Sequence, residues 1–121
     1  MWTLRILYYL CKTRTMEIRF EKDYLEELYR EGKTSDKKYR YAPSVVAKFC
    51  KVIDLLESLG RPEDLYKYHS LNYKALSGNK KGIESVRVND KYRIELRIIK
   101  GQAEAVLTVC SIIELSNHYK G

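Results

Sequence analysis

Cysteine is scarce in this chain, and its placement excludes two classes of small protein. The 121 residues include three cysteines, Cys11, Cys50 and Cys110, which are odd in number and far apart. A disulfide framework needs pairs, and a zinc knuckle needs closely spaced ligands, so neither fits. We therefore interpret the three as small apolar residues of a protein in a reducing, cytoplasmic compartment.

Long hydrophobic runs are also missing. The apolar stretch from Trp2 to Cys11 contains Arg5 and has about half of the ~20 residues needed to cross a bilayer. A signal peptide would carry positive charge before its apolar stretch and small residues after it, whereas Lys12 and Arg14 follow this one. The sequence predicts neither a membrane span nor secretion.

Several catalytic motifs are absent as well. The sequence contains no Gly-rich nucleotide loop, no metal-spaced cluster of His and Cys, and no Ser/His/Asp arrangement. Phosphotransfer and metallohydrolase activities therefore lack support, and we expect no metal and no cofactor.

Positive charge, by contrast, is in excess. Lys and Arg outnumber Asp and Glu by 23 to 16, which gives a formal net charge of +7. With 45% hydrophobic and 32% charged residues, the composition is otherwise that of an ordinary globular protein. The excess predicts an anionic partner, which could be a nucleic acid, an anionic membrane or an acidic protein.

The length indicates one domain, and the sequence suggests where it begins. Residues 16–20, "MEIRF", resemble a first strand, and no repeat or low-complexity linker follows them. We predict that residues 1–15 are an extension and that residues 16–121 form the domain. The extension holds three of the seven net positive charges, so the basic signal is weaker in the domain but survives.

Two helices are predicted in the first half of this domain. Residues 21–31 place four apolar or aromatic residues on one face: Tyr24, Leu25, Leu28 and Tyr29. Gly32 is a suitable C-terminal cap. The second helix begins at Pro43 and is stopped by Gly60 and Pro62. Its apolar side should pack on a sheet, because apolar residues recur at three- and four-residue spacing: Val45, Val46, Phe49, Val52, Ile53, Leu56 and Leu59.

A strand pair is predicted in "SVRVNDKYRIEL", where apolar and polar residues alternate. A two-residue loop would place Val88 opposite Lys91 and mix the two faces. A three-residue loop, residues 89–91, instead pairs Val88 with Tyr92, Arg87 with Arg93, and Val86 with Ile94.

A third strand is predicted after a turn at Lys100-Gly101. This turn pairs Ile98 with Ala103, Arg97 with Glu104, Leu96 with Ala105, Arg93 with Thr108 and Tyr92 with Val109. The buried face of the resulting meander would then be Val86, Val88, Tyr92, Ile94, Leu96, Ile98, Ala103, Ala105, Leu107 and Val109.

The open face of this sheet places Arg87 directly opposite Arg93, with Glu95 as the only acid nearby. Like charges across a strand pair cost roughly 0.2–1 kcal/mol, so folding alone gives no reason for the pair. A phosphate would resolve it, because guanidinium groups match its geometry. The alternative is that both arginines extend into water over neighbouring tyrosines. For Arg97, the predicted neighbour Glu104 offers an ordinary cross-strand ion pair.

These residues carry a resemblance to a known family. The stretch "LSGNKKGIESVRVNDKYRIEL" resembles the core signature of HigB-type toxins, the plasmid-killer branch of the RelE/ParE superfamily. The similarity extends from Met16 to the C-terminus in element order and leaves residues 1–15 outside. The matching residues are Leu76, Gly78, Asn79, Lys80, Gly82, Ser85, Val86, Arg87, Val88, Asn89, Tyr92, Arg93 and Ile94.

The resemblance implies a fold and an activity. The fold is α+β, a RelE-like microbial-RNase fold in which an N-terminal strand and a two-helix hairpin pack on an antiparallel C-terminal sheet. The activity is that of a toxin of a type II toxin-antitoxin system, a ribosome-dependent mRNA endoribonuclease, or mRNA interferase. Such toxins cleave the message in the ribosomal A site beside ribosomal RNA, by metal-independent attack of a ribose 2′-OH. A HigA-like helix-turn-helix antitoxin inhibits them.

The resemblance also implies site residues. Arg87 and Arg93 would hold the phosphate, while a second group would follow the RNA backbone: Lys74, Asn79, Lys80, Lys81 and Lys91. The family tail usually ends in Asp-Tyr-His, with His and Tyr catalytic. Here His118 matches the family His, Asn117 replaces its Tyr, and Tyr119 could substitute only if the tail curls back.

Other interpretations stay open at this stage. His118 lies four residues from the end, where a solvated tail residue is the common case. His69 and Lys74 both lie near the place where some relatives use a loop histidine. The same fold could also poison DNA gyrase as a ParE-like protein, or bind RNA or antitoxin without catalysis.

Overall fold

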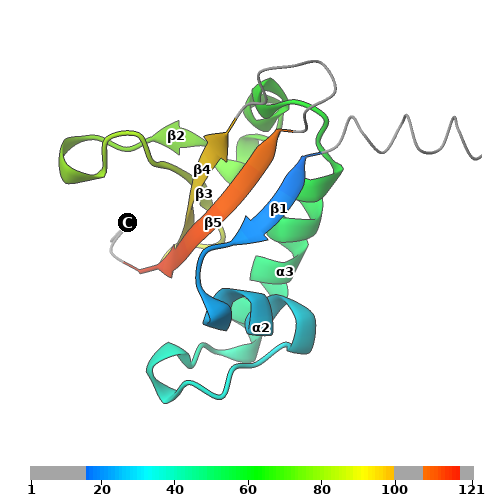
Figure 1. Ribbon diagram of the computed structural model, residues 1–121, viewed down its shortest axis with the longest axis vertical. Helices are drawn as coiled ribbons and strands as arrows, with labels where there is room; N and C mark the ends of the chain where they lie inside the picture. Colours follow the sequence, from blue (N-terminus) through cyan, green and yellow to red (C-terminus); the bar gives the residue numbers. More distant parts are fainter. Residues whose placement is uncertain (1–15, 100–107, 118–121) are drawn as a thin grey trace, which may run out of the picture.

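The computed structural model describes residues 16–99 and 108–117 (Figure 1). Within them, five strands, two α-helices and four short 3₁₀ helices (η) follow one another along the chain. They are β1 (Glu17–Phe20), α2 (Asp23–Glu31), η1 (Lys37–Tyr39), α3 (Pro43–Ser58), η2 (Pro62–Lys67), η3 (His69–Leu71), β2 (Lys74–Ala75), η4 (Gly78–Lys80), β3 (Glu84–Arg87), β4 (Arg93–Ile99) and β5 (Val109–Ser116). The predicted α+β architecture is confirmed. The predicted extension, residues 1–15, lies outside the described residues.

The strands form one sheet in the order β1-β5-β4-β3-β2. Neighbours from β2 to β5 are antiparallel, while β1 runs parallel to β5. The predicted antiparallel sheet is therefore present, and the N-terminal strand adds a parallel edge to it. This places β5, the last strand of the chain, in the interior of the sheet.

Both predicted helices are confirmed, and the local sequence explains their ends. Helix α2 has acidic residues in its first turn, where they favour the helix dipole, and it ends at Gly32 with a φ of 77°. That left-handed conformation suits glycine, and the Gly32 N–H donates to the Leu28 carbonyl. Helix α3 begins with Pro43 in its first turn, where the missing N–H costs nothing.

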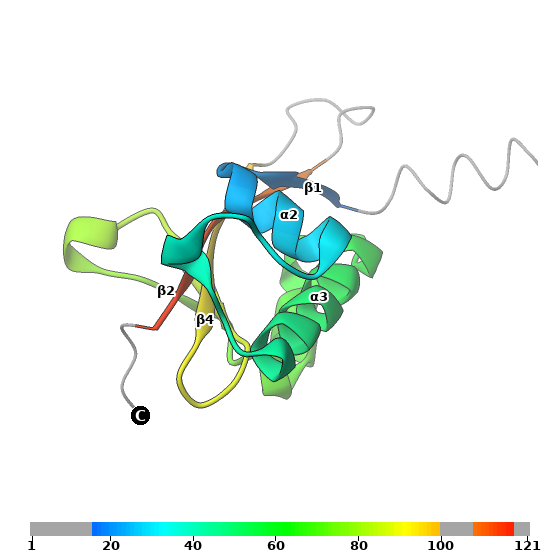
Figure 2. The ribbon, with the colours of Figure 1, turned by 90° about the horizontal axis from the view of Figure 1, so that it is seen from below.

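The core lies between the sheet and these helices. Figure 2 shows α2 and α3 on one side of the sheet, and the arm that carries η4 on the other. The apolar stripe of α3 is buried as predicted, with Phe49, Ile53 and Leu56 at 0% exposure. Val86, Ile94, Leu96 and Ile112 face them from β3, β4 and β5 at the same exposure. Among the described residues, no helix is long and apolar enough to cross a membrane.

The predicted β3–β4 register is confirmed. Arg87 pairs with Arg93 and Val86 pairs with Ile94. The Val88 N–H donates to the Tyr92 carbonyl at 3.0 Å, which closes the three-residue loop. Asn89 explains the length of this loop, because its Oδ1 accepts the backbone N–H groups of Lys91 and Tyr92 at 2.9 and 2.8 Å.

The predicted register of the last strand is wrong. β4 pairs with residues 109–116: Ile98 lies opposite Cys110, Leu96 opposite Ile112, and Arg93 opposite Ser116. Arg97 lies opposite Ser111, not Glu104, and Tyr92 is not paired with Val109. The predicted partners Ala103, Glu104, Ala105 and Leu107, and the Lys100-Gly101 turn, lie outside the described residues.

Side-chain volume accounts for this difference in register. The shift is seven residues from Ile98 to Leu96, an odd number that exchanges the faces of this part of β5, and it becomes eight residues at Arg93, beyond a bulge. Cys110 and Ile112 become buried, and so does Leu115 beyond the bulge, whereas the predicted register would have buried two small alanines together with Leu107 and Val109. Burial of larger apolar groups is worth more. Val109 is half-buried and lies on the other face. Ile113 is the extra residue of a β-bulge opposite Glu95 and Leu96.

The end of β5 is held by tyrosines from the helical side. β1 stops pairing at Ile112, so among the described residues no strand continues along that side of β5, while β4 remains paired on the other side. The Leu115 N–H donates to the Tyr24 hydroxyl at 3.3 Å, and the Tyr41 hydroxyl donates to the Leu115 carbonyl at 3.0 Å. These two bonds satisfy buried backbone groups that the sheet leaves unpaired.

Truncation of the α3 core residue should test the core assignment. We expect Phe49→Ala to lower the free energy of unfolding by about 3–5 kcal/mol, because it removes a fully buried ring and leaves a cavity. Lys48→Ala, on the exposed side of the same helix, should change it by less than about 0.5 kcal/mol. Urea unfolding followed by far-UV circular dichroism measures both, and equal effects would contradict the packing described.

Candidate functional site

The face of the sheet opposite α3 carries most of the polar strand residues, in three rows across the strands. One row runs from β3 to β5 through Arg87, Arg93 and Ser116. A second row crosses β2, β3, β4 and β5, and a third crosses β4, β5 and β1. Their members are Lys74, Ser85, Glu95 and Glu114 in the second row, and Arg97, Ser111 and Arg19 in the third.

Arg93 is buried in this face, where the sequence predicted an open position. Its exposed fraction is 5%. Its Nε donates to the Ser85 hydroxyl at 2.9 Å, and its Nη2 donates to the carbonyl oxygens of Asn72 and Ser85 at 2.6 and 3.2 Å. The Asn72 carbonyl comes from the segment between η3 and β2, which therefore lies over the arginine. A buried guanidinium is tolerable only with such acceptors, so Arg93 is a fixed charge.

Arg87, directly opposite Arg93, is about half exposed. Its Nη2 forms an ion pair with the Asp90 carboxylate, which the sequence argument did not anticipate. The Asp90 side chain is 92% exposed, so this pair is a surface contact that contributes about 0–1 kcal/mol. An anion of higher charge could replace Asp90 at low cost.

Lys80 has a different environment from the one predicted for it. Its Nζ lies 2.5 Å from Oε2 of Glu95, whose side chain is 3% exposed. The pair joins η4 to β4 and brings the arm of residues 74–82 against the polar face. Lys80 therefore has a positioning role in the structure, because a buried carboxylate needs a partner.

The other predicted RNA-binding residues are exposed around this face. Lys74 lies on β2 beside Ser85, Asn79 lies in η4, Lys81 follows it, and Lys91 is in the β3–β4 loop. Lys74 belongs to the second row, and Lys91 lies in the loop that joins the strands of Arg87 and Arg93. Of the two loop candidates weighed against each other, His69 is exposed at the start of η3, one element before Lys74.

Two arginines on this face escaped the sequence argument. Arg97 is exposed and lies beside Ser111, and Arg19 lies on the far side of Ser111 in β1. The wrong register gave Arg97 an acidic neighbour and so removed it from consideration. Arg19 alternates with the half-buried Ile18 and Phe20, and this alternation is the signal that could have placed it on the polar face.

The predicted catalytic tail residues, His118 and Tyr119, lie outside the described residues. The last described residue is Asn117, which is exposed and directly follows Ser116. Because Ser116 is opposite Arg93, β5 leads the chain to the row of the two arginines. No group of three His, Cys, Asp or Glu residues within ranges 16–99 and 108–117 could hold a metal ion.

Burial sets the protonation of the groups that hold β5. It raises the pKa of the Tyr24 hydroxyl and strongly raises that of Tyr41, so both stay neutral, and Tyr41 keeps the proton that it donates to the Leu115 carbonyl. Burial also raises the pKa of the Cys110 thiol to about 12. This thiol therefore stays protonated at neutral pH, as expected for a cysteine that serves as an apolar core residue.

Comparison with known protein families identifies the family to which this chain belongs. A family model described as the RelE-like toxin of the type II toxin-antitoxin system HigB matches residues 18–109, which is well over half of the chain. The chain belongs to this family of HigB-like toxins. The resemblance carried by the arginine strands is thereby confirmed.

A curated relative and two solved structures agree with this assignment. Toxin HigB-1 of Vibrio cholerae is 32% identical over 90 residues, which span 73% of this chain and 90% of the relative. A YoeB/ParE toxin from Agrobacterium tumefaciens matches with a TM-score of 0.51 at 15% identity, covering 86% of this chain and all of that one. YafQ from E. coli matches at 0.50 and 12%, covering 85% and 93%. At these identities, the two structures show a shared fold.

Conservative replacement should separate the two arginines of this HigB-like toxin. We expect Arg93→Lys to lower the free energy of unfolding by about 1–3 kcal/mol, because lysine cannot reproduce the fork that reaches Ser85 and Asn72. Arg87→Lys keeps a half-exposed charge and should change it by less than about 0.5 kcal/mol. Urea titrations of both variants measure the difference, and a harmless Arg93→Lys would contradict a fixed, buried guanidinium.

Proposed function

We propose that this HigB-like toxin is a ribosome-dependent mRNA endoribonuclease that arrests translation. Its family membership supports a toxin of a type II toxin-antitoxin system. The observation that carries the proposal is the row of Arg87 and Arg93, two arginines at directly opposed positions on the polar sheet face, with Arg93 also opposite Ser116 near the end of β5. Arg93 is held by acceptors within the chain, whereas the exposed Arg87 is held only by a surface ion pair that a phosphate could replace.

The two arginines divide the work on the scissile phosphate. Arg87 is exposed enough to contact phosphate oxygens, and in doing so it would release Asp90 to water. Arg93 stays buried behind it and stabilises the negative charge that develops on phosphorus when the 2′-oxygen attacks. A fixed charge in a site of low dielectric constant stabilises such a transition state without reorganisation. In this scheme Arg93 is a positioning and electrostatic residue, and Arg87 is the contact residue.

His118 and Tyr119 would move the protons of this reaction. The 2′-hydroxyl must lose a proton as its oxygen bonds to phosphorus, and the leaving 5′-oxygen must gain one. Neighbouring cations favour the neutral form of an imidazole, which suits His118 for the role of base. Tyr119 would then donate toward the leaving oxygen if the tail curls back. The family's usual tail has Tyr before His, where this chain has Asn117.

The exposed residues around the polar face would hold the message in the ribosomal A site. Lys74, Lys81 and Lys91 can neutralise backbone phosphates, and Asn79 can donate to them from η4. Lys80 would act through Glu95 by holding the arm in place. The partners are then mRNA and ribosomal RNA, in the cytoplasm, with a HigA-like helix-turn-helix antitoxin as the inhibitor.

Cleavage of a message on programmed ribosomes should depend on His118 and Arg87. We expect His118→Ala to slow cleavage by about 10²- to 10⁴-fold, because it removes proton transfer while leaving RNA contacts in place. Arg87→Ala should also slow cleavage, through lost charge stabilisation. Primer extension on the message measures the rates.

His69→Ala is the matched control and should cleave normally. Normal cutting by both the His118 and the Arg87 variants would remove the site assignment. Failure of the unaltered protein to cleave, together with inhibition of DNA gyrase, would select a ParE-like activity instead.

The exposed lysines should govern the salt dependence of RNA binding. We expect Lys74→Ala combined with Lys81→Ala to weaken binding of a fluorescent single-stranded RNA, and to reduce the slope of log K against log salt concentration by about 0.7 for each lost phosphate contact. The control carries Lys48→Ala and Lys51→Ala, which remove equal charge from the exposed side of α3. Equal slopes for both double variants would contradict a localised RNA surface.

A further inference from the structure

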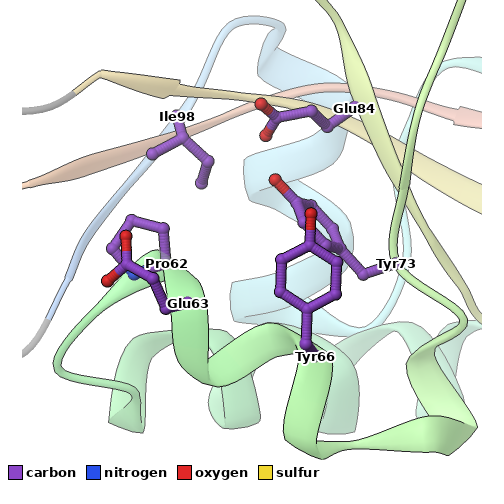
Figure 3. Close-up of a pocket in the computed structure, with 6 residues that line it drawn as sticks. All are labelled: Pro62, Glu63, Tyr66, Tyr73, Glu84 and Ile98. Carbon is purple, nitrogen blue, oxygen red and sulfur yellow. The ribbon is translucent and has the colours of Figure 1, made fainter.

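A second candidate site lies on the helical side of the sheet, away from the arginine row. It is a pocket of about 400 Å³ between η2 and the strands β3 and β4 (Figure 3). Glu84 pairs with Leu96 in the β3–β4 ladder, so both lie on the face that α3 covers. The lining residues are Pro62, Glu63, Tyr66, Tyr73, Glu84 and Ile98.

The Glu84 carboxylate gives this pocket a negative wall. Its Oε2 is inaccessible to solvent and has no hydrogen-bond partner in the part of the chain that the structure describes. Figure 3 shows the Tyr73 hydroxyl directed toward this carboxylate. Burial raises the pKa of Tyr73, and the hydrogen bond to Glu84 raises it further, so the tyrosine stays a neutral donor. A buried carboxylate oxygen gains most from a charged donor.

Two tyrosine rings, those of Tyr66 and Tyr73, also line the pocket. Tyr66 and Tyr73 pack edge to face, with ring centroids 5.0 Å apart and planes at 78°. Tyr66 is 67% exposed, so much of its side chain is open to a partner. Aromatic faces beside carboxylates attract organic cations, and planar guanidinium groups can stack on a ring while they pair with a carboxylate.

We propose that this pocket binds the guanidinium group of an arginine side chain that a protein partner presents. Arginine anchors in pockets beside exposed aromatic side chains are typical of protein interfaces, and the exposed Tyr66 offers such a contact beyond the pocket. The negative pocket would repel RNA, while the opposite face of the sheet is rich in cations. Under the proposed function, on which this last step rests, the partner is the antitoxin, held on a surface separate from the RNA face.

Short peptides test the pocket without any ribosome or antitoxin. The probe is acetyl-Ala-Ala-Arg-Ala-Ala-amide, and its matched controls carry citrulline, a neutral isostere, or lysine in place of arginine. We expect saturable binding to the full chain that shifts the ring resonances of Tyr66 and Tyr73 in NMR spectra. The citrulline and lysine peptides should bind about tenfold more weakly, because each loses part of the charged, forked contact.

Two variants locate this binding, and a third controls for charge. Glu84→Gln keeps the shape of the side chain and should weaken the arginine peptide about tenfold. Tyr66→Leu, at a position that is 67% exposed, removes the aromatic face and should weaken it several-fold. Glu57→Gln, on the exposed side of α3, should leave binding unchanged.

Three outcomes would overturn the proposal. These are equal binding of the arginine and citrulline peptides, unchanged binding by both the Glu84→Gln and Tyr66→Leu variants, or much tighter binding of free N-acetyl-argininamide than of the peptide. The last would identify a free cation as the ligand instead of a protein partner. Because no cleavage is measured, loss of the proposed ribonuclease function would not produce any of these results.

Discussion

The hydrogen bonds of the Arg93 guanidinium are the constraint around which the polar side of this molecule is arranged. A guanidinium can be buried only where acceptors surround it, and here Ser85 and the Asn72 carbonyl provide them. Asn72 lies 21 residues before Arg93, so the bond draws the segment after η3 onto the sheet. Asn72 has a φ of 43°, a left-handed conformation that asparagine tolerates better than most residues. The arm of residues 74–82 begins from this anchored point.

The sheet consequently has two faces with different roles. Its apolar face is closed by α3, whose stripe meets Val86, Ile94 and Leu96 with no exposed area. Its other face contains buried polar side chains, which are tolerated because they have hydrogen-bond or ion-pair partners. The Ser111 hydroxyl donates to the Glu21 carboxylate at 2.7 Å, and Glu95 pairs with Lys80. Rigid support on one side thus lets the other side hold charges in fixed positions, which electrostatic catalysis requires.

Local patterns in the sequence were enough to predict the helices and the first hairpin. The periodicity of α3, Gly32 at the end of α2, and the three-residue loop at Asn89 all act over a few residues, where geometry leaves few choices. Pairing of β4 with the last strand depends on residues farther along the chain. Two registers of that strand, one over residues 103–109 and one over 109–116, place apolar residues opposite those of β4. The burial of Arg93 could not be predicted from the sequence either. One of its acceptors is the Asn72 backbone carbonyl, and because every residue has such a group, no side-chain pattern indicates which one an arginine will bind.

The helical layer also fixes where the chain leaves β5. Beyond Ile112 the strand has lost β1 as a neighbour, and Tyr24 and Tyr41 bind the two backbone groups of Leu115 instead. Tyr24 belongs to α2 and Tyr41 to the segment that leads into α3, so the helical layer holds the last residues of β5. Ser116, one residue later, faces Arg93 from the opposite strand. The course of β5 up to Asn117 is therefore determined jointly by the apolar core and the arginine row, which explains why an interior strand of the sheet ends beside the candidate site.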